Sequence, residues 1–455
     1  MGEINKMNIV HYSLGFPPFR TGGMIKYCMD LMVEEARLGH NVYLLWPGKI
    51  KDYSENMYIK IHKDYKKIKN RVIIHNVEII NPLPVPLLNG IKEFEEFTRY
   101  KNMNSIYRFL EENKIDVLHV HTLMGLPAET IKICKELKVK TLFTTHDYFG
   151  ICPRWGLEKD GNACINDHDC KDCIKCNKNA LSLKKIKFLQ SDLYKVLKNF
   201  FIFKLLRRRN NSKLYIEETN DIGIDISLYK KYQELRKYYI AMLDSFDVIH
   251  YNSNNTKKVY SQYVNNKLSG TIISISHASI KDNKKIKKID SSIIKIGYLG
   301  PITKHKGFFF LKNVCDELYC ETNKFELHIF ERFEEKIPYL KVHSPYKYVE
   351  LEKIMEKFDV LVCPSLWNET FGFTVLEALS YGKPSIVTEN VGAKDLIISE
   401  KTGFIIKCEK EDLKIKLKDL INQPMKIEKM NKYIFENICI KTMREHTKEI
   451  IDLYK

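Results

Sequence analysis

The sequence lacks a long hydrophobic run. Its longest apolar stretch in a basic setting, residues 200–206, is interrupted by Lys204 and is far too short to cross a bilayer. Residues 1–10 enter a strand-like run and show neither the apolar core nor the small-residue cleavage site of a signal peptide. These absences predict a cytoplasmic protein that is not integral to a membrane.

The sequence also lacks the marks of several other classes. It has no internal repeat at solenoid periods and no low-complexity tract. Its first loop has no G-x-G-x-x-G pattern, which argues against an NAD dehydrogenase. Because disulfides are unusual in the cytosol, the seven scattered cysteines of the twelve are expected to be small buried side chains.

The composition is that of a soluble protein with more than one domain. A length of 455 residues suits two or three domains, and 44% hydrophobic residues provide enough apolar material for a core in each. The formal net charge of +17 predicts attraction to an anionic partner. Nucleic acid, anionic lipid and phosphate-bearing substrates all fit, and charge alone does not choose among them.

Apolar runs and helical patterns alternate along both halves of the chain. In the first half we predict strands at 8–12, 42–46, 115–121, 140–145, 247–251 and 271–275, and helices at 24–38, 94–112, 127–137, 228–244 and 255–263. In the second half we predict strands at 295–299, 326–330, 359–363 and 384–388, and helices at 308–318, 351–357 and 373–381. The alternation predicts an α/β protein with two parallel sheets, each covered by helices on both faces.

A polar, lysine-rich stretch at residues 281–292 is expected to be the linker between two doubly wound domains. The N-terminal domain would span 1–280, with an insert at about 150–220, and the C-terminal domain 293–430. Residues 431–455 would form a helix that packs back towards the N-terminal domain. Two such domains place a cleft between them, and ligands of open α/β sheets bind beyond the carboxyl ends of the strands.

The most informative segment is residues 368–377, with the sequence NETFGFTVLE. A helix is expected to start near Gly372, and its first amides and partial positive charge suit a phosphate. Gly372 allows a ligand to approach the backbone closely. Glu377 lies about one turn into the helix and leans back towards its start, and Glu369 lies just outside it. The two carboxylates therefore bracket one small volume, which suits gripping sugar or ribose hydroxyls.

Together with the ALSYGKP that follows it, this segment resembles the donor site of family 4 glycosyltransferases of the GT-B fold. In that fold two Rossmann-like domains face each other across a cleft. The resemblance covers nearly the whole chain except the insert. Further matches, in the expected order, are Gly22-Gly23 after Pro17-Pro18, the strand ends at 116–121 and 146–148, Gly300, Lys306-Gly307, Val391-Gly392 and Gly403.

The resemblance implies a role for each matching residue. Donor-binding residues would be Gly22, Gly23, Gly300, Lys306, Gly372, Phe373, Thr374 and Glu377. Catalytic residues would be Glu369, His121, His146 and Lys306. Glu377 would bind the ribose and Glu369 the transferred sugar, while Lys306 and the amides at the helix start would neutralise the diphosphate leaving group. The two histidines would border the acceptor.

The same resemblance implies retention of anomeric configuration without a metal cofactor, with preorganised amides and an ammonium stabilising the departing phosphate. No residue stands out as a nucleophile, so attack and departure on the same sugar face are expected. One position departs from the family pattern. Where the family often has an arginine after the glycine of the phosphate loop, this chain has Pro301. Lys306 would act without a second cation unless Lys304 or His305 replaces it.

His119 and His121 lie on one expected strand, and we expect only one of them to face the cleft while the other packs. His121 is the candidate because it is nearer the carboxyl end of the strand. A purely structural histidine is the alternative.

Five cysteines crowd into the insert and end in C-x2-C-x2-C. They are Cys152, Cys164, Cys170, Cys173 and Cys176. Four thiolates suffice for tetrahedral zinc, which predicts a structural zinc site with one spare cysteine, and reduced thiols or an iron–sulfur cluster are the alternatives. Asp167-His168-Asp169 formally matches a metal-binding D-x-D, but it lies in this loop and is expected to be solvated.

Residues 177–209 carry ten lysines and arginines against one acid, Asp192, a net charge of +9 (10 − 1), with apolar residues interleaved. A basic amphipathic segment predicts reversible docking on an anionic membrane surface, here the inner face of the plasma membrane. The alternative is a solvated face that packs onto the domain. A lipid-linked saccharide acceptor would explain the docking, and no nucleic-acid partner is expected.

The sequence therefore predicts a glycosyltransferase that moves a sugar from a nucleotide-diphosphate donor to a saccharide or lipid-linked acceptor, in cell-surface polysaccharide or glycan synthesis. A nucleotide-sugar epimerase of the same fold and a non-catalytic membrane-associated binding protein are the alternatives. The intact set of Glu369, Glu377 and Lys306 argues against the binding protein, which has little need of all three.

Overall fold

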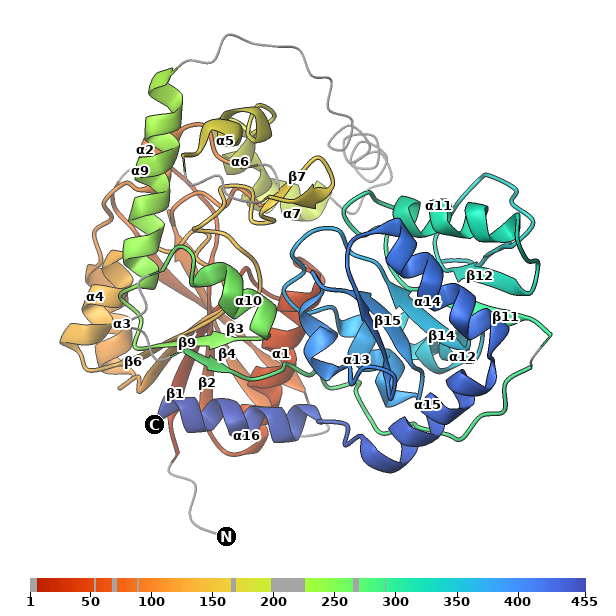
Figure 1. The fold of residues 1–455 in the computed structure, drawn as a ribbon. Helices are drawn as coiled ribbons and strands as arrows, with labels where there is room; N and C mark the ends of the chain where they lie inside the picture. Colours follow the sequence, from red (N-terminus) through yellow and green to blue (C-terminus); the bar gives the residue numbers. More distant parts are fainter. Residues whose placement is uncertain are drawn as a thin grey trace.

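The structure is a computed structural model of the chain. It describes residues 6–52, 55–67, 72–87, 90–164, 169–197, 226–264, 270–290 and 292–455. Two sheets, each flanked by helices, lie side by side (Figure 1). The predicted architecture of two doubly wound parallel sheets is confirmed.

The N-terminal sheet has eight strands in the order β10-β9-β6-β5-β1-β2-β4-β3. All neighbours are parallel except β3 and β4. The strands are β1 (Asn8–Tyr12), β2 (Asn41–Pro47), β3 (Tyr58–Lys67), β4 (Val72–Ile80), β5 (Val117–Val120), β6 (Lys140–Thr144), β9 (Val248–Tyr251) and β10 (Gly270–Ile272). The helices are α1 (Gly23–Arg37), α2 (Phe94–Phe97), α3 (Asn104–Glu112), α4 (Glu129–Glu136), α9 (Ile226–Leu243) and α10 (Asn254–Tyr260).

The insert lies between β6 and α9. Its described elements are the hairpin β7 (Glu158–Lys159) and β8 (Asn162–Ala163), and the short helices α5 (Lys171–Cys176), α6 (Leu183–Leu189) and α7 (Asp192–Leu197). Within the described residues, no helix is both long and apolar enough to cross a membrane.

The C-terminal sheet has six parallel strands in the order β13-β12-β11-β14-β15-β16. They are β11 (Ile294–Tyr298), β12 (Phe325–Ile329), β13 (Leu340–Val342), β14 (Val360–Cys363), β15 (Ser385–Thr388) and β16 (Gly403–Ile406). The helices are α11 (Phe308–Tyr319), α12 (Leu351–Met355), α13 (Phe373–Ser380), α14 (Lys410–Asn422) and α15 (Met425–Asn437), with the 3-10 turns η2 (Tyr348–Glu350) and η3 (Gly392–Leu396).

Helix α16 (Met443–Tyr454) leaves the C-terminal domain and packs on α1 and β6 of the N-terminal domain (Figure 1). Its Ile450 is fully buried in an apolar cluster that also contains Tyr27 and Leu31 of α1 and Val375 of α13. One apolar cluster therefore joins both domains.

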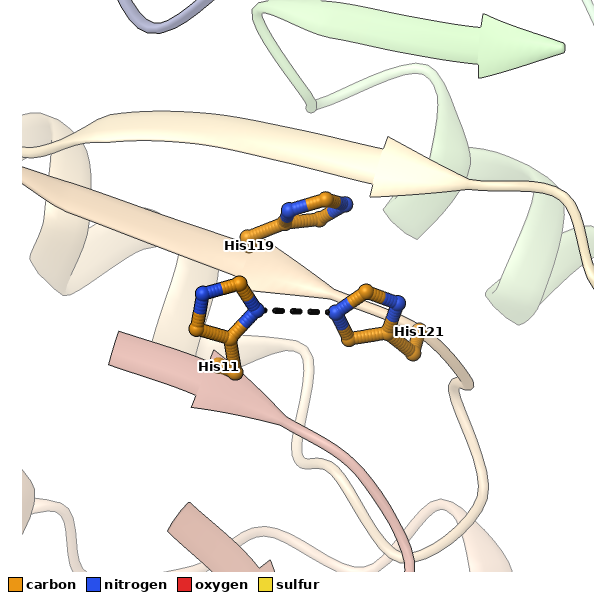
Figure 2. Close-up of side chains that lie close together, drawn as sticks. All are labelled: His11, His119 and His121. Carbon is orange, nitrogen blue, oxygen red and sulfur yellow. Dashed lines mark hydrogen bonds between the residues drawn. The ribbon is translucent and has the colours of Figure 1, made fainter. Parts of the chain in front are cut away.

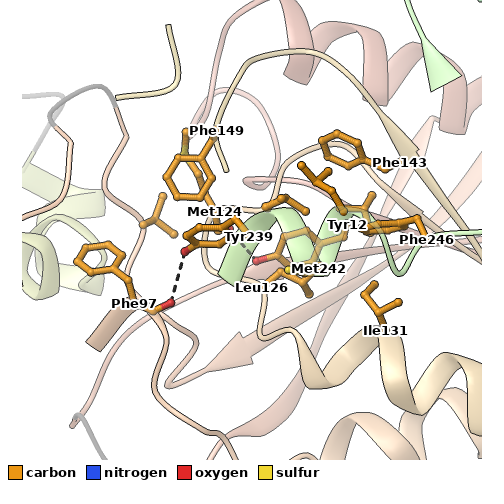
Figure 3. Close-up of a cluster of buried hydrophobic side chains, with 14 of the residues drawn as sticks. Tyr12, Phe97, Met124, Leu126, Ile131, Phe143, Phe149, Tyr239, Met242 and Phe246 are labelled. Atoms are coloured by element: carbon orange, nitrogen blue, oxygen red, sulfur yellow. Dashed lines mark hydrogen bonds between the residues drawn. The ribbon is translucent and has the colours of Figure 1, made fainter. Parts of the chain in front are cut away.

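The interior of the N-terminal domain lies between the sheet and α9. Tyr12 and Tyr239 are buried there, and each uses its hydroxyl as a donor, to the carbonyls of Met124 at 2.9 Å and Phe97 at 3.3 Å (Figure 3). Large buried rings with satisfied hydroxyls contribute apolar burial without leaving a polar group unpaired.

The single helix predicted over residues 94–112 is wrong, because α2 and α3 are separate helices. Between them, the amide of Asn102 donates to the carbonyl of Glu55 at 3.0 Å, and residues 56 and 102 form a bridge. A contact with a distant segment thus takes the backbone out of the helix. The antiparallel pair β3 and β4 was also not predicted.

Candidate active site

The start of α13 is held in place by the segment after β15. Gly372 has a φ of 99°, which favours glycine, and precedes the first residue of the helix. The backbone amide of Glu369 donates to the carbonyl of Asn390 at 2.9 Å, and the carbonyl of Glu369 accepts from the amide of Gly392 at 3.0 Å. The loop that carries Glu369 is therefore fixed by backbone bonds, and the hydroxyl of Ser253 adds a side-chain bond to the carbonyl of Thr370 at 2.7 Å.

Lys306 and Glu369 come together at this helix start. The Lys306 ammonium lies 2.5 Å from Oε1 of Glu369, and the Ser365 hydroxyl donates to Oε2 at 2.5 Å. Burial raises the pKa of Glu369, but the charge of Lys306 and these hydrogen bonds outweigh it and hold the pKa below its ordinary value. The Glu369 carboxyl is therefore ionised at neutral pH.

The neighbours of Lys306 differ in what they offer an anion. Burial and the charge of Lys306 lower the pKa of His305 to about 4, so His305 is neutral and does not supply the second cation. Lys304 is exposed, and its side chain lies against Gly161 of the insert. The Pro301 carbonyl accepts from the hydroxyl of Tyr298 at 2.7 Å, next to Gly300.

Glu377 is 4% exposed and faces residues that the sequence did not single out. Its Oε1 lies 3.2 Å from Nε2 of His277 and accepts from the hydroxyl of Tyr348. Burial and the charge of Glu377 raise the pKa of Tyr348. The ring of His277 also contacts that of Phe373 at 5.1 Å between centroids, so Glu377 lies within reach of the helix start.

The N-terminal domain meets this helix start with the loop before α1. An added Cβ on Gly23 would lie 3.7 Å from the ring of Phe373, and Gly22 has a φ of 123°. The hydroxyl of Thr370 donates to the carbonyl of His146 at 3.1 Å. The structure thus brings Gly22, Gly23 and His146 to the same domain interface as Lys306 and Glu369.

The insert also contacts the C-terminal side of the site. The amide of Ala163 donates to the carbonyl of Leu366 at 3.0 Å, and Trp155 packs edge-on against Trp367 with centroids 5.3 Å apart. No sequence motif predicted these contacts. The signal available was that both tryptophans lie within a few residues of matched motifs.

The expectation that one of His119 and His121 faces the cleft while the other packs is wrong, because both side chains lie on the same face of β5 and both are buried. Residues two apart on a strand share a face, and the two rings lie with centroids 4.2 Å apart. Both are 0% exposed, and both lie beside His11 of β1 (Figure 2). His121 reaches the domain interface only through His146, whose Nε2 lies 3.1 Å from its Nδ1.

Burial sets the charge of these histidines. Burial and the neighbouring histidines lower the pKa of His146 and of His250 to about 3, and hold the pKa values of His119 and His121 well below their ordinary value. These four rings are therefore neutral at pH 7. His11, Glu35, His250 and Tyr454 belong to the same cluster and were not predicted, because no local pattern connects residues so far apart in sequence.

The five cysteines of the insert do not form a ligand set here. Cys170 and Cys173 are buried, and Arg236 donates to the sulfur of Cys173 at 3.6 Å. In the described chain, which includes all twelve cysteines, none is in a disulfide. The one group of three or more histidine, cysteine or acidic residues with ligand atoms within 4.8 Å of one another is His11, His119 and His121, again among described residues. The structural zinc site stays a prediction. Asp167 and His168 lie outside the described residues.

Two family models match the chain. Glycosyltransferase Family 4 matches residues 21–163, and Glycosyl transferases group 1 matches residues 279–437. The chain belongs to the family 4-like glycosyltransferases. The first match contains the Gly22-Gly23 loop, His121 and His146, and the second contains Lys306 and the α13 segment.

Solved structures similar to this glycosyltransferase cover nearly all of it. Sucrose-phosphate synthase from Thermosynechococcus elongatus is 12% identical, with a TM-score of 0.56 over 99% of this chain and 98% of that one. Anabaena HepE in complex with UDP is 11% identical, with a TM-score of 0.56 over 98% and 99%. These likenesses show the GT-B fold. An uncharacterised 42.6 kDa protein in the cps region of Klebsiella pneumoniae is 20% identical over 396 residues, 85% of this chain and 86% of that protein.

Proposed function

We propose that this glycosyltransferase transfers a sugar from a nucleotide-diphosphate donor bound at the start of α13. The observation that carries the proposal is the Lys306–Glu369 pair, 2.5 Å apart at a helix start that faces the Gly22-Gly23 loop. An ammonium and free helix amides stabilise the negative charge that develops on a departing diphosphate. The UDP in the similar HepE structure supports this class of donor.

The proposed division of labour follows the positions of the side chains. Lys306, Gly300 and the amides of Gly372, Phe373 and Thr374 bind the diphosphate, and Gly22 and Gly23 close on it from the other domain. Glu377, buried beside His277, binds the ribose. Glu369 binds the transferred sugar and His146 borders the acceptor, with His121 behind it.

Retention of configuration is part of the proposal. Glu369 is already engaged by Lys306 and Ser365, so it is poorly placed to act as a free nucleophile. Attack and departure on one sugar face need no such nucleophile. Nuclear magnetic resonance of the freshly formed linkage measures the outcome, and an inverted anomeric centre would contradict this part.

The acceptor is proposed to be a growing cell-surface saccharide, free or lipid-linked. The similar Klebsiella pneumoniae protein is described as lying in a cps region, which supports that role. Product analysis separates this function from the epimerase alternative, because an epimerase returns a nucleotide sugar and forms no new linkage.

A peripheral position on an anionic membrane is also proposed, from the surface of α6 and α7. Phe188, Leu193 and Val196 are 39%, 60% and 63% exposed, and Lys184 and Lys185 beside them are exposed. Ile186 of the same helix is buried, so α6 both packs on the domain and presents an apolar and basic face. Residues 198–209 of the predicted basic segment lie outside the described residues.

Flotation with anionic vesicles tests the membrane proposal. Charge reversal of Lys184 and Lys185 to glutamate is expected to weaken binding, since each lysine near an anionic surface contributes about 1 kcal/mol. Reversal of the exposed Lys410 and Lys429, on α14 and α15 of the C-terminal domain, is the matched control. Equal flotation of wild type and both variants would remove the proposal.

The donor is tested by a thermal-shift screen against UDP, GDP, ADP and CMP sugars. We expect one nucleotide class to raise Tm, because a ligand that binds only the folded state stabilises it. The Glu377→Gln variant should lose that shift while keeping its own fold. If no nucleotide sugar raises Tm, the donor proposal fails.

A further inference from the structure

A chain of hydrogen bonds starts at His146 and runs through the buried interior of the N-terminal domain. Each neighbouring pair of atoms lies 2.5–3.1 Å apart. In order, the groups are His146, His121, His11, Glu35, Tyr454, His119, Thr144, His250 and the carbonyl of Ile273. Figure 2 shows the central contact, between His11 and His121.

The donor of each bond can be assigned by starting at the carbonyl of Ile273, the inner end of the chain. A carbonyl only accepts, so His250 donates to Ile273 from Nε2, and Nδ1 of a neutral His250 accepts from the hydroxyl of Thr144. Thr144 has a single hydrogen, so His119 donates to it from Nε2. Nδ1 of His119 then accepts from the hydroxyl of Tyr454.

If all the histidines are neutral and Glu35 is a carboxylate, the chain has one hydrogen too few to make every contact a hydrogen bond. The missing hydrogen is the one between Glu35 and Tyr454. Tyr454 has used its hydrogen on His119, yet its oxygen lies 2.7 Å from Oε1 of Glu35. A carboxyl hydrogen on Glu35 fills that contact. A cation on His119 or His250 would fill it as well, by turning the Tyr454 hydroxyl round. A Glu35 carboxylate with neutral partners would leave two lone pairs face to face.

The bonds between His146 and Glu35, the outer half of the chain, are the same whether the extra proton lies on Glu35, His119 or His250. His11 donates from Nε2 to Oε2 of Glu35 at 2.5 Å, and its Nδ1 accepts from Nε2 of His121 at 3.0 Å. Nδ1 of His121 in turn accepts from Nε2 of His146. If these bonds ran the other way, the contacts of Glu35 with His11 and with Tyr454 would each need an added hydrogen. The buried cluster would then carry a net positive charge, which burial strongly disfavours.

His146 is therefore left with a bare Nδ1. Within the described chain that atom has no hydrogen-bond partner. His146 is half-buried at the domain interface, where its backbone carbonyl accepts from the hydroxyl of Thr370. The three bonds from His146 to Glu35 all run inward, so their dipoles add, and this alignment strengthens Nδ1 of His146 as an acceptor.

A metal ion among His11, His119 and His121 is the competing interpretation, because their ligand atoms lie within 4.8 Å. All six ring nitrogens already have protein partners: one pair joins His11 to His121, and the others reach Glu35, Tyr454, Thr144 and His146. A metal would have to break several of these bonds, so the hydrogen-bonded chain is the better account of the cluster.

We propose that Glu35, His11 and His121 are positioning residues that hold His146 in the Nε2–H tautomer, so that its Nδ1 accepts a hydrogen bond from a substrate hydroxyl. The identity of that hydroxyl, on a sugar donor or acceptor, rests on the proposed function. The tautomer of His146 does not depend on the proposed function, and it is measured separately.

The test is long-range 1H–15N spectroscopy of the full chain labelled with 15N-histidine, at pH 7 and without ligand. His11, His121 and His146 are each expected to carry the proton on Nε2, with Nδ1 bare and no imidazolium signal. Addition of Zn2+ should leave their signals in place. An Nδ1–H tautomer at His146, a cation at any of the three, or a Zn2+-dependent shift would overturn the proposal.

Two substitutions at one position extend the test. In Glu35→Gln the amide oxygen accepts from His11 and the amide nitrogen donates to Tyr454, so the His146 tautomer and kcat should stay within about twofold of wild type. Glu35→Leu removes the acceptor of His11. Both tautomers of His146 should then appear, and kcat should fall about tenfold with the donor KM unchanged.

Glu35→Gln behaving like Glu35→Leu would contradict the proposal. If Glu35→Leu does not fold, the wild-type spectrum and Glu35→Gln still decide it. If no transfer activity is found with any donor, the proposed function fails while the spectra still report on the tautomer.

Discussion

Lys306 keeps Glu369 ionised at a partly buried place, where 23% and 14% of their side chains are exposed. A bound diphosphate would share the ammonium with Glu369, and the carboxylate would then be free to accept from sugar hydroxyls. Under the proposed function, the ion pair therefore positions both groups before a donor binds.

We expect Lys306→Ala to lower the transfer rate roughly hundredfold, because it removes the ammonium next to the departing phosphate. Steady-state kinetics with the donor found in the thermal-shift screen measure the loss. Lys312→Ala is the control, since Lys312 pairs with Asp316 on nearby α11 and should keep its rate. An equal loss in both variants would show a general effect of charge instead.

At this scale the sequence singles out a candidate site residue only when a local motif surrounds it. Glu369 and Gly372 lie within a few residues of the motif that carries the resemblance. The partners of Glu377 come from elsewhere, 100 residues before it for His277 and 29 for Tyr348. Such partners are set by tertiary packing, which no local pattern encodes.

At the scale of elements, the start of α13 depends on a residue without a side chain. Gly372 has a φ of 99°, and a Cβ there would lie 3.0 Å from Cγ1 of Val391 and 3.7 Å from the carboxyl carbon of Glu369. A side chain would therefore strain the backbone and also crowd the site.

Gly39 offers a matched control for that position, because its φ is 97° and a Cβ there would meet nothing within 4 Å. We expect Gly372→Ala and Gly39→Ala each to lower the free energy of unfolding by about 1–2 kcal/mol, the cost of a left-handed conformation. Only Gly372→Ala should lose transferase activity. Thermal denaturation together with activity assays separates the two effects, and full activity in Gly372→Ala would argue against a donor site at this helix.

The sequence predicted most of the alternating strands and helices of the two sheets, because their apolar runs are short and bounded by turn residues. It did not predict β13, β16 or α14. The break between α2 and α3 was missed, since it depends on the bond from Asn102 to Glu55. The strand pair β3 and β4 was missed as well. Its outer strand is rich in lysine, and Ile61 on it is 71% exposed, which hides the usual alternation.

At the scale of the whole molecule, the buried histidines make the fold sensitive to acid. His119, His121, His146 and His250 have lowered pKa values in the folded protein, about 3 for His146 and His250. The unfolded chain binds protons at these rings below about pH 6.5, whereas the folded chain does not. The free energy of unfolding should therefore fall as pH falls.

The expected slope is about 1.4 kcal/mol per pH unit for each of these histidines between roughly pH 6 and pH 4. Tm measured from pH 7.5 to pH 4.5 checks this, with proton uptake on unfolding measured in buffers of different ionisation enthalpy. A Tm that stays constant down to pH 4.5 would show that these rings are protonated in the folded protein.

Because Tyr454 is synthesised after the entire C-terminal domain, the N-terminal domain leaves the ribosome without one of its interior residues. Until α16 arrives, Glu35 and His119 lack the hydroxyl that joins them, and Tyr27 lacks its 2.8 Å partner, His446. The half of the enzyme that is made first therefore completes its interior hydrogen bonds only after the half that is made second.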